Sequence, residues 1–186
     1  MADFAYLMKN RLNENCEGLD FQTTPIWKIF VLSILTGGLY HIVYFYSLWK
    51  TIKVKFGFKN APFWRALFSG ITNFWLFPIL GVYFERFNNK IKNASLLATF
   101  YFLICWVSNR MAMSTWNSEL INYGIEVLDL FLTLVLTLIV VKFQSIINKI
   151  NQENFPNAEV NGWKLSNTIW SIVFALLTIL YFIPIE

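Results

Sequence analysis

The sequence predicts an all-α integral membrane protein, a polytopic helical bundle with four crossing spans and one re-entrant or interfacial helix. Hydrophobic residues make up 56% and charged residues 14% of the 186 positions, whereas soluble domains usually carry about 25% charge. Residues 26–49 form an apolar run, and a helix of this length crosses a hydrocarbon core of about 30 Å. Basic residues gather in short segments beside the apolar runs, as the positive-inside rule describes, so the net charge of +4 does not predict nucleic-acid binding.

The chain divides into a polar N-terminal tail, residues 1–25, and a helical membrane domain, residues 26–186. The apolar residues with helical spacing in the tail are Phe4, Leu7, Met8 and Leu12. They predict a short amphipathic helix on the membrane surface, followed by a polar linker at residues 13–22. Pro25 predicts the start of the first membrane helix, because proline is tolerated in a first helical turn. The tail lacks the pattern of a cleavable signal peptide, so we expect the first apolar run to act as its own insertion signal.

Residues 26–49 are compatible with a continuous helix or with a hairpin. Gly37 and Gly38 favour a break, because each glycine weakens a helix by up to about 1 kcal/mol relative to alanine. Polar residues nevertheless recur every three or four positions through the glycines, at Ser33, Thr36, Tyr40, Tyr44, Ser47 and Thr51. This unbroken phase favours one continuous, kinked span, with the hairpin as the alternative.

The next segment, residues 50–65, is basic and contains no acidic residue. Its basic residues are Lys50, Lys53, Lys55, Lys59 and Arg65. We expect this segment to lie in the cytoplasm. These five side chains are also candidate contacts for anionic lipid, at roughly 1 kcal/mol per base near the surface, although topology determination alone accounts for them.

Residues 66–84 are apolar enough to span the membrane but are followed by a second net-basic stretch, residues 85–92. A segment with both ends in the cytoplasm does not cross. We therefore expect a re-entrant or interfacial helix near residues 63–91, with a true span at 66–84 as the alternative.

Three further runs, residues 94–112, 125–143 and 165–183, are expected to cross. The helix over residues 125–143 should continue beyond the membrane, because an apolar stripe follows it. The stripe consists of Phe143, Ile146, Ile147 and Ile150. Residues 84–91 and 143–150 share Phe, Asn, Lys and Ile in register, which favours placing both on the same side of the membrane.

Polar stripes on the first run and on residues 125–143 form a candidate path for a proton or small cation. The residues of this candidate polar path are His41, Tyr40, Tyr44, Arg110, Glu126, Asp129 and Thr133. His41 and Asp129 would be the titrating groups and Arg110 a counter-ion near the outer mouth. Alternatively, His41 bonds a carbonyl or a tyrosine, and the threonines bond their own helix backbone.

The sequence contains no recognisable signature of catalysis or of cofactor binding. We find no GxSxG, HExxH, P-loop or dinucleotide fingerprint, and Cys16 and Cys105 lack the spacing of a metal site. We therefore expect a protein that is not an enzyme, with no catalytic residue, no metal and no cofactor.

Three stretches, LTGGLYHIVYFYSLWKTIK, NAPFWRALFSGI and INKINQENFPNAEVNGWKLSN, resemble an uncharacterised family of bacterial inner-membrane proteins. In that family a TxGLYxxYxFYxxW run is followed by PxWRA. Residues 43–45 depart from it, because the family more often has Tyr-Trp-Phe where this chain has Val-Tyr-Phe. The resemblance implies a multi-pass protein of the bacterial inner membrane and implies no activity.

Two functional classes follow from these features. The first is a non-catalytic membrane factor that binds membrane lipids, a membrane-protein partner or a second copy of itself, such as an immunity or envelope-stress component. The second is a minimal proton or cation channel or transporter that uses the two polar stripes. Nucleic-acid binding is not expected, because no soluble domain would host it. Small size and few intramembrane charges favour the first class.

Overall fold

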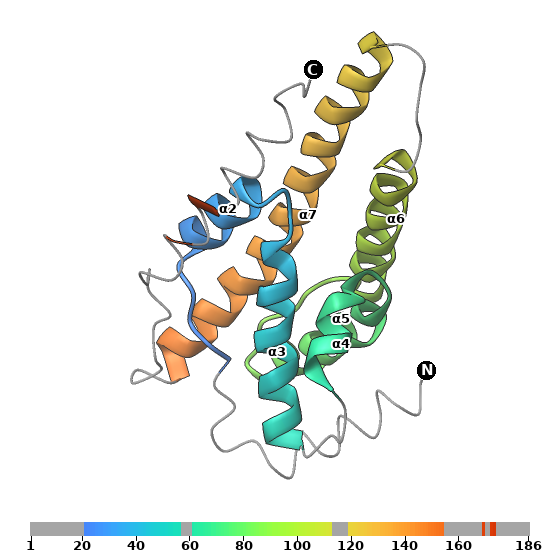
Figure 1. Ribbon diagram of the computed structural model, residues 1–186. Helices are drawn as coiled ribbons and strands as arrows, with labels where there is room; N and C mark the ends of the chain where they lie inside the picture. The colour runs from blue at the N-terminus through green and yellow to red at the C-terminus, as the bar shows by residue number, and fades with distance from the viewer. Residues whose placement is uncertain (1–20, 57–60, 113–118, 155–168, 170–171, 174–186) are drawn as a thin grey trace.

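The computed structural model of the protein describes residues 21–56, 61–112, 119–154, 169 and 172–173, and its elements there are α-helices (Figure 1). The helices are α2 (Ile26–Leu35), α3 (Tyr40–Phe56), α4 (Pro62–Leu67), α5 (Ser69–Arg86), α6 (Ala94–Ala112) and α7 (Glu119–Asn154). The predicted all-α class is confirmed. The amphipathic helix expected in the tail, and most of the span expected at residues 165–183, lie outside the described residues.

Within the described ranges, α7 is the one helix long and apolar enough to cross a membrane. Helix α2 is apolar but has only 10 residues, which is about 15 Å of helix. Helix α6 has the bounds predicted for a span, and α7 continues beyond residue 143 as expected. The fold is thus compatible with membrane insertion, but these helices do not by themselves support four crossing spans.

The prediction of one continuous helix over residues 26–49 is wrong. The chain turns between α2 and α3, where Gly37 and Gly38 adopt φ values of 54° and 87°, in the left-handed region that favours glycine. The Thr36 hydroxyl donates to the Leu32 carbonyl (2.7 Å) and accepts from the Tyr40 amide (2.9 Å). Thr36 therefore bonds both the end of α2 and the start of α3. Because of this link, the polar residues keep their spacing of three or four positions although the helix is broken.

Helices α2 and α3 form a hairpin whose α2 arm packs along the second half of α7 and whose α3 arm packs against α4. At its base, the Thr24 amide donates to Asn148 Oδ1 at 3.2 Å. At its tip, a Cβ added to Gly38 would lie 3.5 Å from Cγ2 of Thr133. Between Asn148 and Thr133 the hairpin follows about 22 Å of α7, at 1.5 Å per residue.

Helices α4 and α5 follow one another with only Phe68 between them, and the chain bends sharply there; we call this bent pair of helices the second hairpin. The Thr72 hydroxyl donates to the Arg65 carbonyl at 2.5 Å across this turn. Helix α5 then runs antiparallel to α6, because a Cβ at Gly70 would meet Cys105, and one at Gly81 would meet Ala94. The helical segment predicted near residues 63–91 is therefore present, as two helices.

Aromatic rings join the hairpins to α6 and α7. Phe45 of α3 lies 5.5 Å from the ring of Tyr101, and Phe77 of α5 lies 4.3 Å from that of Phe143. Phe84 and Phe143, which occupy matching positions in the two related segments, are 6.1 Å apart. Phe143, Ile147 and Ile150 are all buried, as the apolar stripe predicted.

Three amide side chains of α7 hold the extended segment that precedes α2. Gln144 donates to the Gln22 carbonyl (3.0 Å), Asn148 to that of Thr24 (2.8 Å) and Asn151 to that of Phe21 (2.5 Å). The Phe21 ring is buried, 4.9 Å from the ring of Tyr83. We call Gln144, Asn148 and Asn151 the amide clasp. The packed core thus includes Phe21, a residue assigned to the polar tail.

Candidate functional site

Polar side chains meet where the tips of the two hairpins touch α6 and α7. His41, in the first turn of α3, is buried between two hydroxyls. Its Nδ1 lies 3.4 Å from the Tyr101 hydroxyl of α6, and its Nε2 lies 3.3 Å from the Thr137 hydroxyl of α7. His41 therefore contacts Thr137, a member of the polar stripe on α7, although His41 is not part of the stripe predicted on residues 33–51.

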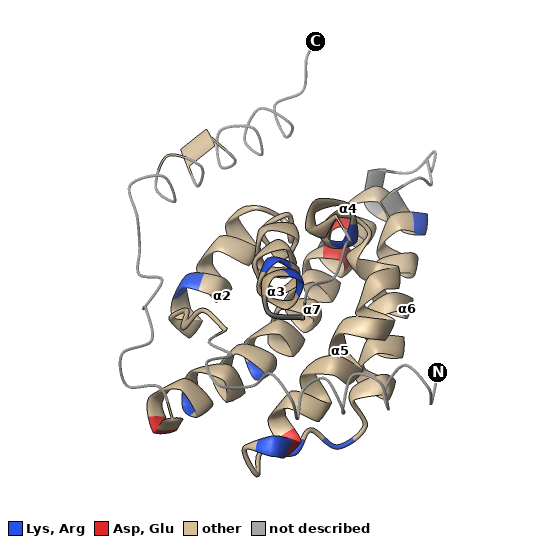
Figure 2. Ribbon diagram, turned by 90° about the horizontal axis from the view of Figure 1, so that it is seen from below, with Lys and Arg blue, Asp and Glu red and all other residues tan. Residues whose placement is uncertain are grey.

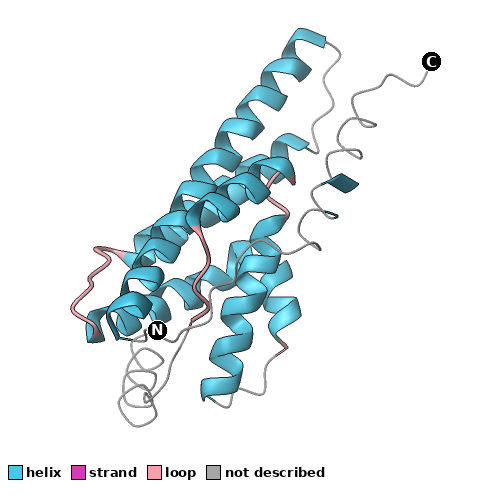
Figure 3. Cartoon of the chain, turned by 90° about the vertical axis from the view of Figure 1, so that its left-hand side faces the viewer, coloured by secondary structure: helices cyan, strands magenta, loops and turns pink. Residues whose placement is uncertain are grey.

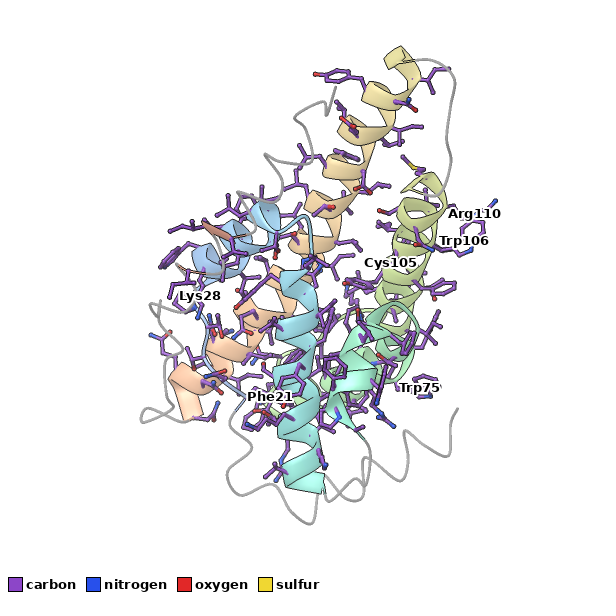
Figure 4. All side chains as sticks on the ribbon, viewed as in Figure 1. Phe21, Lys28, Trp75, Cys105, Trp106 and Arg110 are labelled. Atoms are coloured by element: carbon purple, nitrogen blue, oxygen red, sulfur yellow. The ribbon has the colours of Figure 1, made fainter. Side chains whose placement is uncertain are left out.

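Tyr101 connects this contact to the second hairpin. Its hydroxyl also hydrogen-bonds the side chains of Ser69, at the start of α5, and Cys105, one turn further along α6. We call His41, Ser69, Tyr101, Cys105 and Thr137 the tip cluster. Sequence reasoning missed Tyr101, because it stands in an apolar run with no polar periodicity. Figure 4 labels Cys105, which lies on the side of α6 that faces the bundle.

The tip cluster is largely satisfied by its own hydrogen bonds. A neutral imidazole offers one donor and one acceptor, and each ring nitrogen of His41 has a hydroxyl partner. Thr137 also donates to the Thr133 carbonyl of its own helix at 2.8 Å. These contacts are those of a histidine that links helices, which was the alternative to a titrating group.

The remaining residues of the candidate path lie apart from the tip cluster. Asp129 is two turns further up α7, about 12 Å from Thr137 along the helix, and accepts a hydrogen bond from the Ser108 hydroxyl. Thr133 is buried between these two levels, whereas Glu126 and Arg110 are exposed.

The two tyrosines of the path lie on α3. Tyr40 is half-buried, and the Tyr44 hydroxyl is buried without a hydrogen-bond partner among the described residues. The structure thus places His41 against Thr137, leaves Thr133 and Asp129 at successive levels further up α7, and does not bring the whole path into one cluster.

Basic side chains are concentrated at the end of the molecule where α3, α5 and α7 finish. Figure 2 looks at this end and shows basic residues on each of these elements. The exposed ones are Lys50, Lys53, Arg86, Lys90, Lys92 and Lys149, which we call the basic end. Lys149 pairs with Glu153 at 3.9 Å. The Lys55 side chain and Lys59 lie outside the described part of the chain.

Arg65 differs from the other candidate lipid contacts, because it is packed against a ring. Its guanidinium carbon lies 4.4 Å from the centre of the Trp49 ring, in a cation–π contact. The side chain is half-buried, and a guanidinium stays protonated at neutral pH. Arg65 therefore stabilises the contact between α3 and α4.

Large apolar side chains cover the surface above the basic end. Figure 4 shows Trp75 and Trp106 pointing away from the bundle. The exposed members of this apolar belt include Trp27, Phe30, Phe63, Trp64, Phe68, Ile71, Trp75, Phe100, Leu103, Trp106, Val127, Leu128, Leu130 and Phe131. Exposed apolar side chains this large and numerous are typical of a surface that contacts a membrane or a partner.

In the described part of the chain no three His, Cys, Asp or Glu side chains are grouped so as to hold a metal ion. The resemblance to an uncharacterised inner-membrane family stays a prediction. Comparisons with models of protein families, with curated proteins and with solved structures found no match to this chain.

Proposed function

We propose that the protein is a non-catalytic integral membrane factor that binds anionic lipid head groups at its basic end. The observation that carries this proposal is that the described helices expose the large apolar side chains of the belt and also gather exposed basic side chains at one end of the molecule (Figure 2). Apolar side chains would contact acyl chains, and the lysines would lie at the level of the head groups. Each base contributes roughly 1 kcal/mol near an anionic surface.

In this proposal α6 and α7 cross the bilayer, and the two hairpins enter it from the cytoplasmic side. Helix α6 has 19 residues, or about 28 Å of helix, which suits a hydrocarbon core of about 30 Å. The tip cluster then lies near the middle of the membrane, and the basic end lies in the cytoplasm in agreement with the positive-inside rule. Residues 165–183 would add a third crossing helix.

Lipid retention tests the head-group site directly. The protein is purified in mild detergent from membranes that contain phosphatidylglycerol, and the bound lipid is counted by mass spectrometry. We expect Lys50→Gln combined with Lys53→Gln to lower the retained phosphatidylglycerol. Arg110→Gln, which removes a base from the opposite end, should leave it unchanged. Equal retention by all three proteins would refute the lipid site.

A second candidate, a minimal proton or cation path, is favoured by the contact of His41 with Thr137 of the polar stripe on α7. It is tested by flux into proteoliposomes, with His41→Ala and Asp129→Asn as the variants. The path requires wild-type flux above that of protein-free vesicles and a loss of flux in both variants. Wild-type vesicles no more permeable than empty ones would eliminate it.

A further inference from the structure

The described helices fill the two halves of the molecule unequally. Both hairpins end within about one helical turn of the His41–Thr137 contact, because Gly38 lies beside Thr133 and Ser69 hydrogen-bonds Tyr101, a partner of His41. Below that level α2 packs against α7, α3 against α4, and α5 against α6. Above it, among the described residues, only the end of α6 and the first half of α7 continue (Figures 1 and 3).

Helix lengths give the size of this difference. From Glu119 to Thr133, α7 rises about 21 Å above the tips, and from Cys105 to Ala112, α6 rises about 10 Å. A helix about 10 Å across occupies on the order of 80 Å² of a leaflet. Four hairpin helices therefore add on the order of 300 Å² to the leaflet that holds the basic end.

Side-chain exposure agrees with this shape. Phe131 and Leu130 of α7 are 57% and 55% exposed, whereas Phe143 and Ile147, about three to five turns lower, are at most 1% exposed. Among the described residues, the upper half of α7 thus has fewer neighbours than its lower half. If residues 165–183 cross as predicted, they add equal area to both leaflets and leave the difference unchanged.

We propose that the protein is a wedge that concentrates in membrane whose cytoplasmic surface is convex. This inference rests on the proposed membrane topology. A bilayer bent in that direction has an expanded cytoplasmic leaflet, which accommodates the two hairpins at a lower elastic cost than a flat leaflet does. Curvature-dependent binding is known for amphipathic helices that insert into one leaflet, and two half-depth hairpins insert more volume than one such helix.

Membrane tubes pulled from giant vesicles test the wedge. The full chain carries a dye on a short N-terminal peptide tag, and an impermeant quencher reports which face is outward. We expect the protein with its basic end outward to be at least about twofold denser, relative to a lipid dye, in the tube than in the vesicle. Protein of the reverse orientation should be depleted from the tube.

A pair of glycine variants provides the matched control. Gly37→Ala with Gly38→Ala opposes the turn at the first tip and favours a straight helix, so the enrichment should fall. Gly124→Ala has open space around its added methyl group and should behave as wild type. If the double variant does not fold, the wedge is still tested by comparing the tube enrichment of wild-type protein in its two orientations.

The outcomes of this experiment distinguish a failure of the wedge from a failure of the proposed membrane topology. Equal density in tube and vesicle, for protein that resists alkaline extraction, overturns the wedge and leaves the membrane factor standing. Protein that alkaline carbonate releases from the vesicles overturns both. Enrichment of the reverse orientation contradicts the assignment of the hairpins to the cytoplasmic leaflet.

Discussion

The two halves of α7 differ in what surrounds them. The lower half is covered by both hairpins and carries an aromatic core and the amide clasp, as a helix does inside a soluble domain. The upper half is an apolar helix whose described neighbours lie mainly on one side, along α6. Internal packing therefore holds the lower half, whereas the upper half requires an apolar solvent or a further helix to cover it.

The largest expected effect compares one phenylalanine from each half. Phe143→Ala removes a buried ring that contacts Phe77 and Phe84, so the free energy of unfolding should fall by about 3–5 kcal/mol. Phe131→Ala removes an exposed ring and should change it by less than about 0.5 kcal/mol. Thermal unfolding in detergent, followed by size-exclusion chromatography, measures both. Equal losses would mean that the two halves of α7 are packed alike.

The amide clasp should give the next largest effect. Asn148→Ala leaves the amide and the carbonyl of Thr24 without their partner and removes an acceptor from Gln144, a cost of about 1–3 kcal/mol. Gln152→Ala, an exposed amide on the same helix, is the control. Hydrogen exchange of the amide of Thr24 should accelerate only in the Asn148 variant. Unchanged exchange would show that the extended segment is held by the Phe21 ring alone.

The clasp also marks the limit of what the sequence predicts. Its bonds join residues 122 to 130 positions apart, and amides at helical spacing read as an ordinary polar face. Helix α6, by contrast, was predicted with its observed bounds, because a continuous apolar run ending in polar residues is a local signal. Phe21 was assigned to a polar tail, since its neighbours in sequence are polar and its partner Tyr83 is distant.

The break between α2 and α3 was misjudged for a different reason. Polar periodicity predicts a continuous helix when the polar side chains share one face for contact with a partner. In the structure several of these hydroxyls bond their own backbone instead, as Ser47 does with Tyr44 and Thr51 with Ser47. The regular spacing of these polar side chains therefore arises within each helix separately and does not require one continuous helix. The opposition of His41 to the polar face of α7 was predicted, but the role of Tyr101 was not.

The tips should respond more weakly than the core or the clasp. Gly38 has a φ of 87° and lies against Thr133, so Gly38→Ala should cost about 1–2 kcal/mol in the free energy of unfolding. Gly124→Ala, in the open upper half of α7, should be neutral or stabilise the protein by up to about 1 kcal/mol. A lower unfolding temperature for Gly38→Ala together with an equal or higher one for Gly124→Ala would support the difference between the tip and the upper half of α7. A neutral Gly38→Ala would mean that the turn tolerates alanine.

The smallest expected effect lies at the boundary between the halves. Tyr101→Phe keeps the ring against Phe45 and removes only the hydroxyl, which leaves His41 Nδ1 without its partner at a cost of about 1 kcal/mol. Tyr123→Phe, at a position 67% exposed, should have no measurable effect. Nitrogen NMR of labelled His41 provides a second readout, because the loss of one hydroxyl partner changes the tautomer balance of the ring. An unchanged His41 spectrum would show that Thr137 alone sets the tautomer and that Tyr101 contacts the hairpins through Ser69.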